Sequence, residues 1–130
     1  MYLANRTPPS LQVYDTSLGP TGVPRNVATG SSDICRAASS LTVFDPGAGE
    51  RAYVTCFQDG QVYVVDPSGQ TQVDDIVTVG RGPYGVAGIM GRKQLFVSNF
   101  LEDTIAVIDV DPTSRTRNRV VLRIGIPRAP

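Results

Sequence analysis

Short runs of alternating apolar and polar residues, separated by turn residues, recur along the chain. The clearest runs are rich in Val, Ile, Tyr and Phe and lie at residues 84–89, 95–99, 104–109 and 119–124. Glycine, proline and aspartate fill the gaps between them, as expected for tight turns. No segment keeps an apolar period of 3.6 residues over several turns. The sequence therefore predicts an all-β protein with almost no helix.

The same series of elements occurs three times. Residues 53–56 and 61–66 (YVTC and QVYVVD) match residues 96–99 and 104–109 (FVSN and TIAVID), and a weaker first copy begins at Tyr2. Each copy is followed by a segment that ends in glycine, at Gly30, Gly80 and Gly125. A period of roughly 40 to 45 residues built from short strands is typical of four-stranded β-propeller blades.

The repeats predict one partial propeller domain over residues 1–130, a partial ring of about three blades. Its parts are an incomplete blade at about 2–30, full blades at about 37–80 and 84–125, and the start of a next strand at 126–130. A blade buries its faces only against neighbouring blades, so this chain is not expected to close a ring alone. The expected partners are the rest of a larger propeller chain, other subunits, or copies of the chain itself.

The second and third copies resemble the YVTN-type β-propeller repeat. Residues 79–87 (VGRGPYGVA) are similar to that family's join between blades. The resemblance implies a closed ring of about seven blades. It also implies a bacterial protein that is periplasmic, cell-surface or secreted, because the family belongs largely to bacterial and archaeal envelope or secreted proteins.

Charge and composition exclude several functions. The chain has 12 basic and 12 acidic residues, which argues against a nucleic-acid partner or a membrane-surface patch. Its longest apolar runs have the length of a strand, so no membrane span is expected. Without histidine, Ser-His-Asp and Cys-His-Asn triads and His-ligated zinc or haem are excluded. We therefore predict no catalytic residue and no cofactor in this chain.

The leading functional hypothesis is a non-enzymatic binding or structural scaffold. The resemblance leaves two alternatives open. One is part of a propeller enzyme, similar to a lactonase or a dehydrogenase subunit, whose catalytic residues lie in other blades. The other is an accessory subunit of a larger redox or photosynthetic assembly.

Polar residues recur where the strands of each copy end. The third strand ends in an aspartate, whose carboxylate is expected to accept hydrogen bonds from backbone amides two or three residues on: Asp15, Asp66 and Asp109. The side chains at the end of the second strand are expected to bond within the turn that follows: Asn5, Thr55 and Asn99. The weaker alternative is Ca²⁺ held at a rim by Asp59 or Asp103 with backbone carbonyls.

The two cysteines are expected to form a disulfide. If residues 37–44 and 51–57 make a hairpin, Cys56 faces about Ser40, and an insertion at residues 31–38 that breaks the period brings Cys35 close. A disulfide indicates an oxidising compartment. The alternative is two separate buried thiols.

Three arginines alternate in one inter-strand loop, Arg115, Arg117 and Arg119. Alternation places them on one side if the segment is extended. A solvated hairpin is the more common structure for such a loop, and the weaker alternative is a contact with a small anion or a carboxylate-bearing partner.

Overall fold

The computed structural model describes residues 1–68 and 70–129, and these form three antiparallel sheets. The first sheet holds β1 (Tyr2–Arg6), β2 (Pro9–Asp15) and β3 (Val27–Asp33). The second holds β4 (Ala38–Phe44), β5 (Arg51–Cys56), β6 (Gln61–Asp66) and β7 (Gln72–Thr78). The third holds β8 (Pro83–Ile89), β9 (Gln94–Asn99), β10 (Thr104–Asp109) and β11 (Arg119–Ile124), with a short 3-10 turn, η1 (Met90–Arg92), between β8 and β9. The predicted all-β class is confirmed.

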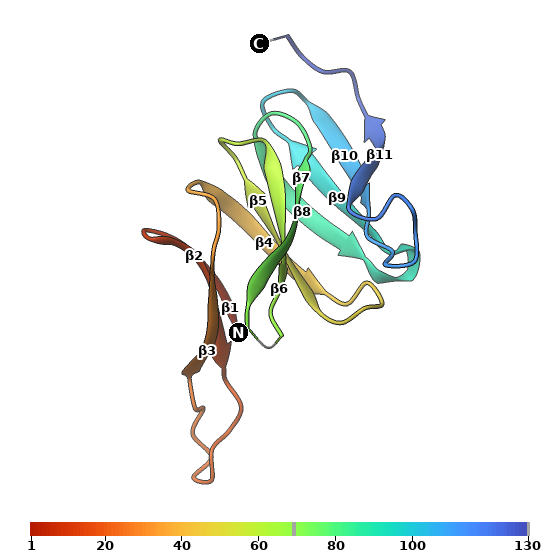
Figure 1. Cartoon of the computed structure of the whole chain (residues 1–130). Coiled ribbons are helices and arrows are strands. Elements are labelled where there is room, and N and C mark those ends of the chain that lie inside the picture. The colour runs from red at the N-terminus through yellow and green to blue at the C-terminus, as the bar shows by residue number, and fades with distance from the viewer. Residues whose placement is uncertain (69, 130) are drawn as a thin grey trace.

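The three sheets follow one another in space in the order of the chain (Figure 1). The first sheet contacts the second through β1 against β4 and β3 against β7. The second contacts the third mainly through β4 and β5 against β8, and also through β7 against β11. The β1–β3 sheet lacks the strand that would correspond to β4 or β8. The insertion that breaks the period is partly a strand, because β3 runs to Asp33 instead of ending at Gly30.

Two apolar cores hold the sheets together, one in each gap. Between the first two sheets, Leu11 packs with Val54 and Val65. Between the second and third sheets, the core is formed by the side chains of Tyr53, Val62, Val64, Val77, Val79, Leu95, Val97, Ala106, Ile108 and Val110. Burying one such Val or Leu side chain stabilises the fold by roughly 1.5–3 kcal/mol.

Strand β5 shows how the alternation of the sequence produces this layering. Successive side chains of a strand point to opposite faces, so Tyr53 belongs to one core and Val54 to the other. All six residues of β5 are buried. The ring of Tyr53 also stacks on Phe44, with ring centroids 5.2 Å apart. The middle sheet is therefore covered on both faces.

Candidate functional site

The β8–β11 sheet has one face packed against β4–β7 and one face left open. The open face, as we call it, consists of six apolar residues in adjacent strands: Ala87, Phe96, Ile105, Val107, Leu122 and Ile124. Three of these side chains are exposed, Ile105 at 38%, Ile124 at 47% and Leu122 at 56%, whereas Val107 between them is 2% exposed. A shallow hollow of about 370 Å³ lies on this face beside Phe96 and Ile105.

The open face corresponds, repeat by repeat, to a face that is buried elsewhere in the molecule. Phe96 and Ile105 match Tyr53 and Val62 in the sequence repeat. Tyr53 is 1% and Val62 0% exposed, because both pack against the β8–β11 sheet. Ile105 is therefore exposed where Val62 contacts the next sheet, whereas Phe96 is half-buried.

In the first sheet too, the equivalent positions contact the next sheet. Its residues at these positions are Tyr2 and Leu11, and both pack on the β4–β7 sheet. Both sheet-to-sheet interfaces thus use equivalent faces in the same orientation. The sequence repeat shows which positions are equivalent. The observed register and the order of the sheets are needed to tell which of these faces are covered and which one is open.

The three strand-ending aspartates cap turns as predicted. Ser17 N donates to Asp15 Oδ1 (2.9 Å), Ser68 N to Asp66 Oδ1 (2.9 Å), and Asp111 N to Asp109 Oδ1 (3.0 Å). The Ser17 and Ser68 hydrogen bonds lower the pKa of Asp15 and of Asp66. Burial opposes ionisation of Asp109, but hydrogen bonds from Ser114 and Thr116 outweigh it and lower its pKa. These carboxylates have a local structural role.

The prediction for the second-strand ends is right for Asn5, partly right for Asn99 and wrong for Thr55. Asn5 Nδ2 donates within its turn to Thr7 O (3.5 Å). Asn99 Nδ2 donates to Thr104 Oγ1 (3.1 Å) at the end of its turn and also to Val79 O (3.2 Å).

Thr55 lies one residue before the turn position, so its hydroxyl points across the sheets. It lies within hydrogen-bonding distance of two carbonyl oxygens, Ser40 O (3.3 Å) and Tyr84 O (3.1 Å) in the next sheet. The hairpin register pairs Cys56 with Gln61 where it pairs Asn99 with Thr104. The residue equivalent to Asn99 is therefore Cys56.

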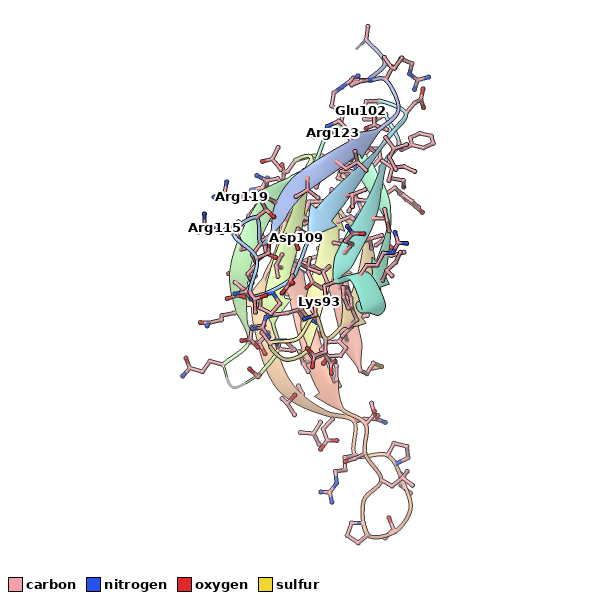
Figure 2. All side chains as sticks on the ribbon, turned by 90° about the vertical axis from the view of Figure 1, so that its right-hand side faces the viewer. Lys93, Glu102, Asp109, Arg115, Arg119 and Arg123 are labelled. Atoms are coloured by element: carbon pink, nitrogen blue, oxygen red, sulfur yellow. A yellow bond between two sulfur atoms is a disulfide. The ribbon has the colours of Figure 1, made fainter. Side chains whose placement is uncertain are left out.

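A buried polar cluster around Asn99 was not anticipated from the sequence. Glu102 is 7% exposed, and its Oε1 accepts from Arg81 N (2.6 Å) while its Oε2 accepts from Thr104 Oγ1 (3.1 Å). Arg123 lies 4.0 Å from the same carboxylate, at the end of the sheet away from Lys93 (Figure 2). The backbone hydrogen bond from Arg81 lowers the pKa of Glu102 despite its burial. The cluster fastens the join between the second and third sheets to the β9–β10 hairpin.

The structure joins Cys35 and Cys56 in a disulfide, with the Cα atoms 5.9 Å apart. One detail of the prediction is wrong: Cys56 faces Ala38 and not Ser40, because a bulge at Ser39 shifts the register. The pairing agrees with the expected oxidising compartment.

The disulfide occupies the place that Gly80 and Asn99 occupy in the next repeat. Cys56 pairs with the first residue of β4 as Asn99 pairs with the first residue of β8. A Cβ atom on Gly80 would lie 2.6 Å from Asn99 Nδ2, so these two residues are also in close contact. One repeat thus has a covalent link where the other has a buried amide.

Arg115, Arg117 and Arg119 do not form the extended face on which the weaker alternative, a contact with an anion or a carboxylate, depends. The segment before β11 is a series of turns, closed by Ser114 N to Asp111 O (3.1 Å) and by Asn118 N to Asp109 O (2.6 Å). Asn118 has a φ of 57°, so alternation does not apply there. Figure 2 places Arg115 and Arg119 at the outer edge of the sheet.

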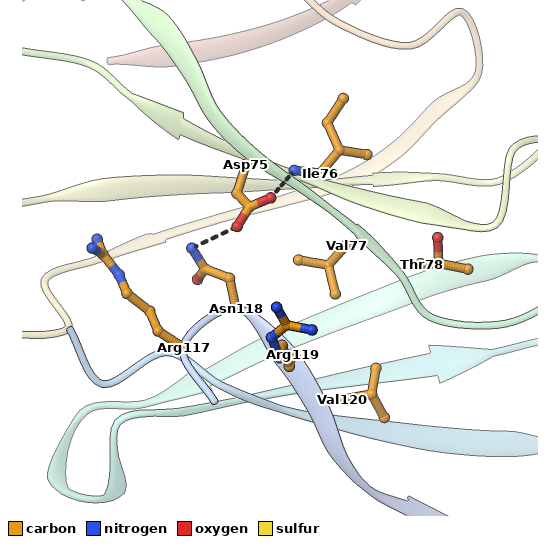
Figure 3. Close-up of a pocket in the computed structure, with 8 residues that line it drawn as sticks. All are labelled: Asp75, Ile76, Val77, Thr78, Arg117, Asn118, Arg119 and Val120. Carbon is orange, nitrogen blue, oxygen red and sulfur yellow. Dashed lines mark hydrogen bonds between the residues drawn. The ribbon is translucent and has the colours of Figure 1, made fainter. Parts of the chain in front are cut away.

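Two of these arginines line a polar groove of about 510 Å³ between β7 and β11. Arg117 forms an ion pair with Asp74 (3.7 Å). Asn118 Nδ2 donates to Asp75 Oδ2 (3.4 Å) across the groove, and the Arg117 and Arg119 side chains point in different directions (Figure 3). Arg115 does not line the groove, so the three arginines do not form one site.

The candidate calcium ligands lie apart, in different hairpins. Asp59 is in the β5–β6 turn, and Asp103, in the β9–β10 turn, forms an ion pair with Arg128 (3.3 Å). Within residues 1–68 and 70–129, no three Cys, Asp or Glu side chains are grouped so that they could hold a metal ion. The structure therefore adds nothing in favour of a calcium site at these residues.

No protein-family model matches the chain, and no curated protein matches its sequence. Among the described residues, no helix has the length and hydropathy to span a membrane.

Proposed function

We propose that the chain is a non-enzymatic scaffold of the β-propeller type, in which a further antiparallel sheet of the same repeat covers the open face of β8–β11. The observation that carries the proposal is the exposure of Ile105 (38%) at a position that is fully buried in both earlier copies, as Leu11 and Val62. Contact through equivalent faces in one orientation is the head-to-tail type that extends into rings or arrays.

Two properties of the chain support this proposal over an enzyme. The sequence has no histidine to act as a general base near neutral pH. The apolar residues of the open face are contiguous, and such faces usually mark contact surfaces between proteins. The disulfide supports a periplasmic, cell-surface or secreted location. The resemblance to YVTN-type repeats supports the same location and the ring.

The test is the native mass of the full chain by light scattering over a range of concentrations. We expect particles heavier than one 13.9 kDa chain, alone or with co-purifying chains, because association covers the open face. Ile105→Lys and Leu122→Lys should each release single chains. Leu18→Lys is the matched control, since Leu18 is 65% exposed but lies in the loop between β2 and β3.

Two outcomes would overturn the proposal. One is a wild-type chain that stays a monomer, without other chains, at every concentration. The other is a particle that Leu18→Lys dissociates as readily as Ile105→Lys does. Circular dichroism of each variant separates loss of contact from loss of fold.

A further inference from the structure

A pocket of about 460 Å³ lies where one end of each of the three sheets meets the others. Arg6 comes from the end of β1, residues 37–39 from the start of β4, Phe57 and Gln58 from the β5–β6 hairpin, and Tyr84 from β8. Its volume lies in the range of small-molecule sites, which is roughly 300–1,000 Å³. None of the residues assigned above to the open face contributes to it.

Hydrogen bonds hold the walls of this pocket in place. Phe57 N donates to Ala37 O (3.0 Å), which fixes the hairpin against the start of β4. Ser39 Oγ donates to Pro83 O (2.9 Å), which fixes β4 against the strand that carries Tyr84. The walls formed by β4, the β5–β6 hairpin and β8 are therefore set in advance by packing of the sheets, as is common in binding sites.

The side chains offer apolar surface, hydrogen bonds and one positive charge. Tyr84 is 58% exposed, and it lines the pocket together with Phe57. Gln58 provides an amide that both donates and accepts hydrogen bonds. Arg6 is the one charged residue among the described residues that line the pocket, and no acidic side chain in the described part of the chain forms an ion pair with it.

We propose that this pocket binds a small ring compound that carries a single carboxylate. The guanidinium of Arg6 matches one carboxylate in bidentate geometry, and it leaves no second cation for a more highly charged group. The ring of the ligand lies against Tyr84 and Phe57, and Gln58 bonds its polar substituents. Sugar acids and aromatic acids share this chemistry. This inference goes beyond the scaffold function and does not depend on it.

The experiment is a titration of the full chain, followed by backbone amide shifts in NMR spectra. The probes are glucuronate and benzoate, with glucose and benzamide as their neutral counterparts. We expect at least one acid to bind about tenfold or more tightly than its neutral counterpart, because a charge-assisted pair is lost without the carboxylate. A gain for glucuronate identifies a sugar-acid site, and a gain for benzoate identifies an aromatic-acid site.

Variants separate this pocket from general attraction of anions. Arg6→Gln should remove the advantage of the acid over its neutral counterpart, and Tyr84→Ala should weaken binding of both. Arg25→Gln and Phe100→Ala are matched controls, because both residues are exposed and lie outside the pocket. Equal binding of the acids and their neutral counterparts would overturn the proposal, and so would an equal effect of Arg25→Gln and Arg6→Gln.

Discussion

At the scale of single residues, hydrogen bonds of buried polar side chains stabilise the connections between repeats. Glu102 and Asn99 are almost fully buried, and their hydrogen bonds reach the join that leads into β8. A charged group tolerates such burial only when its hydrogen bonds are made. The Glu102 carboxylate meets this condition through Arg81 N, Thr104 and the neighbouring Arg123.

We predict that Glu102→Gln destabilises the protein at neutral pH and flattens its response to acid. The folded state lowers the pKa of Glu102, so its contribution is present above the unfolded value near 4.3 and is lost as pH falls through the folded pKa. The loss at pH 7 should be roughly 1–3 kcal/mol. Urea unfolding at pH 7 and at about pH 3 measures both effects.

Asp33→Asn is the control for this comparison, because Asp33 is exposed and its carboxylate forms no ion pair within the described residues. Its unfolding free energy at pH 7 should match that of the wild type. A Glu102→Gln protein as stable as Asp33→Asn at pH 7 would contradict the role given to Glu102.

At the scale of elements, the sequence predicted strands well and irregular segments poorly. Strands β10 and β11 have the predicted bounds, because their alternation and flanking turn residues are both clear. In the segment before β11, arginines also alternate with uncharged residues. The segment nevertheless forms turns and is not extended, because aspartate side chains accept hydrogen bonds from its backbone and Asn118 has a left-handed conformation. The bulge at Ser39 left no recognisable pattern. Local alternation carries the strand signal, whereas bulges and faces depend on contacts between sheets.

We predict that Gly88→Ala weakens the contact between the second and third sheets. A Cβ atom on Gly88 would overlap the ring of Phe44, which is itself stacked on Tyr53. Overpacking of this kind costs about 1–3 kcal/mol. Gly91→Ala is the control, because a Cβ atom there has no neighbour within 4 Å. Thermal unfolding of the two variants should differ clearly, and equal midpoints would show that Phe44 moves aside.

We also predict that replacing both cysteines by serine lowers the unfolding free energy by about 2–4 kcal/mol. The disulfide links residues 21 apart and ties the start of the second sheet to its β5–β6 hairpin. Guanidinium unfolding with and without a reductant measures the effect. Reductant should lower the stability of the wild type to that of the double variant and leave the double variant unchanged.

At the scale of the whole molecule, burial is graded from the middle sheet outward. β5 is buried along its full length, whereas β3 is mostly exposed and β11 is exposed at five of its six residues. The two cores depend on the middle sheet, since each cluster includes side chains from it.

Hydrogen exchange should follow this gradient. We predict that amides of β5 and β6 exchange most slowly and those of β3 most rapidly, because slow exchange requires opening of both cores. Exchange followed by mass spectrometry of peptides tests the order. If β9 and β10 become protected as protein concentration rises, while β3 does not, covering of the open face is the direct explanation.

The correspondence between the disulfide and the Gly80–Asn99 contact also bears on how such repeats diverge. The disulfide and the Gly80–Asn99 contact link equivalent positions of successive repeats, yet one is a covalent bond and the other a non-covalent contact. The interaction at these positions can therefore change by mutation in one repeat without a matching change in the neighbouring repeats. In a protein built by duplication, units that fold on one plan can thus drift until few of their residues are alike, and the backbone register outlasts the sequence identity.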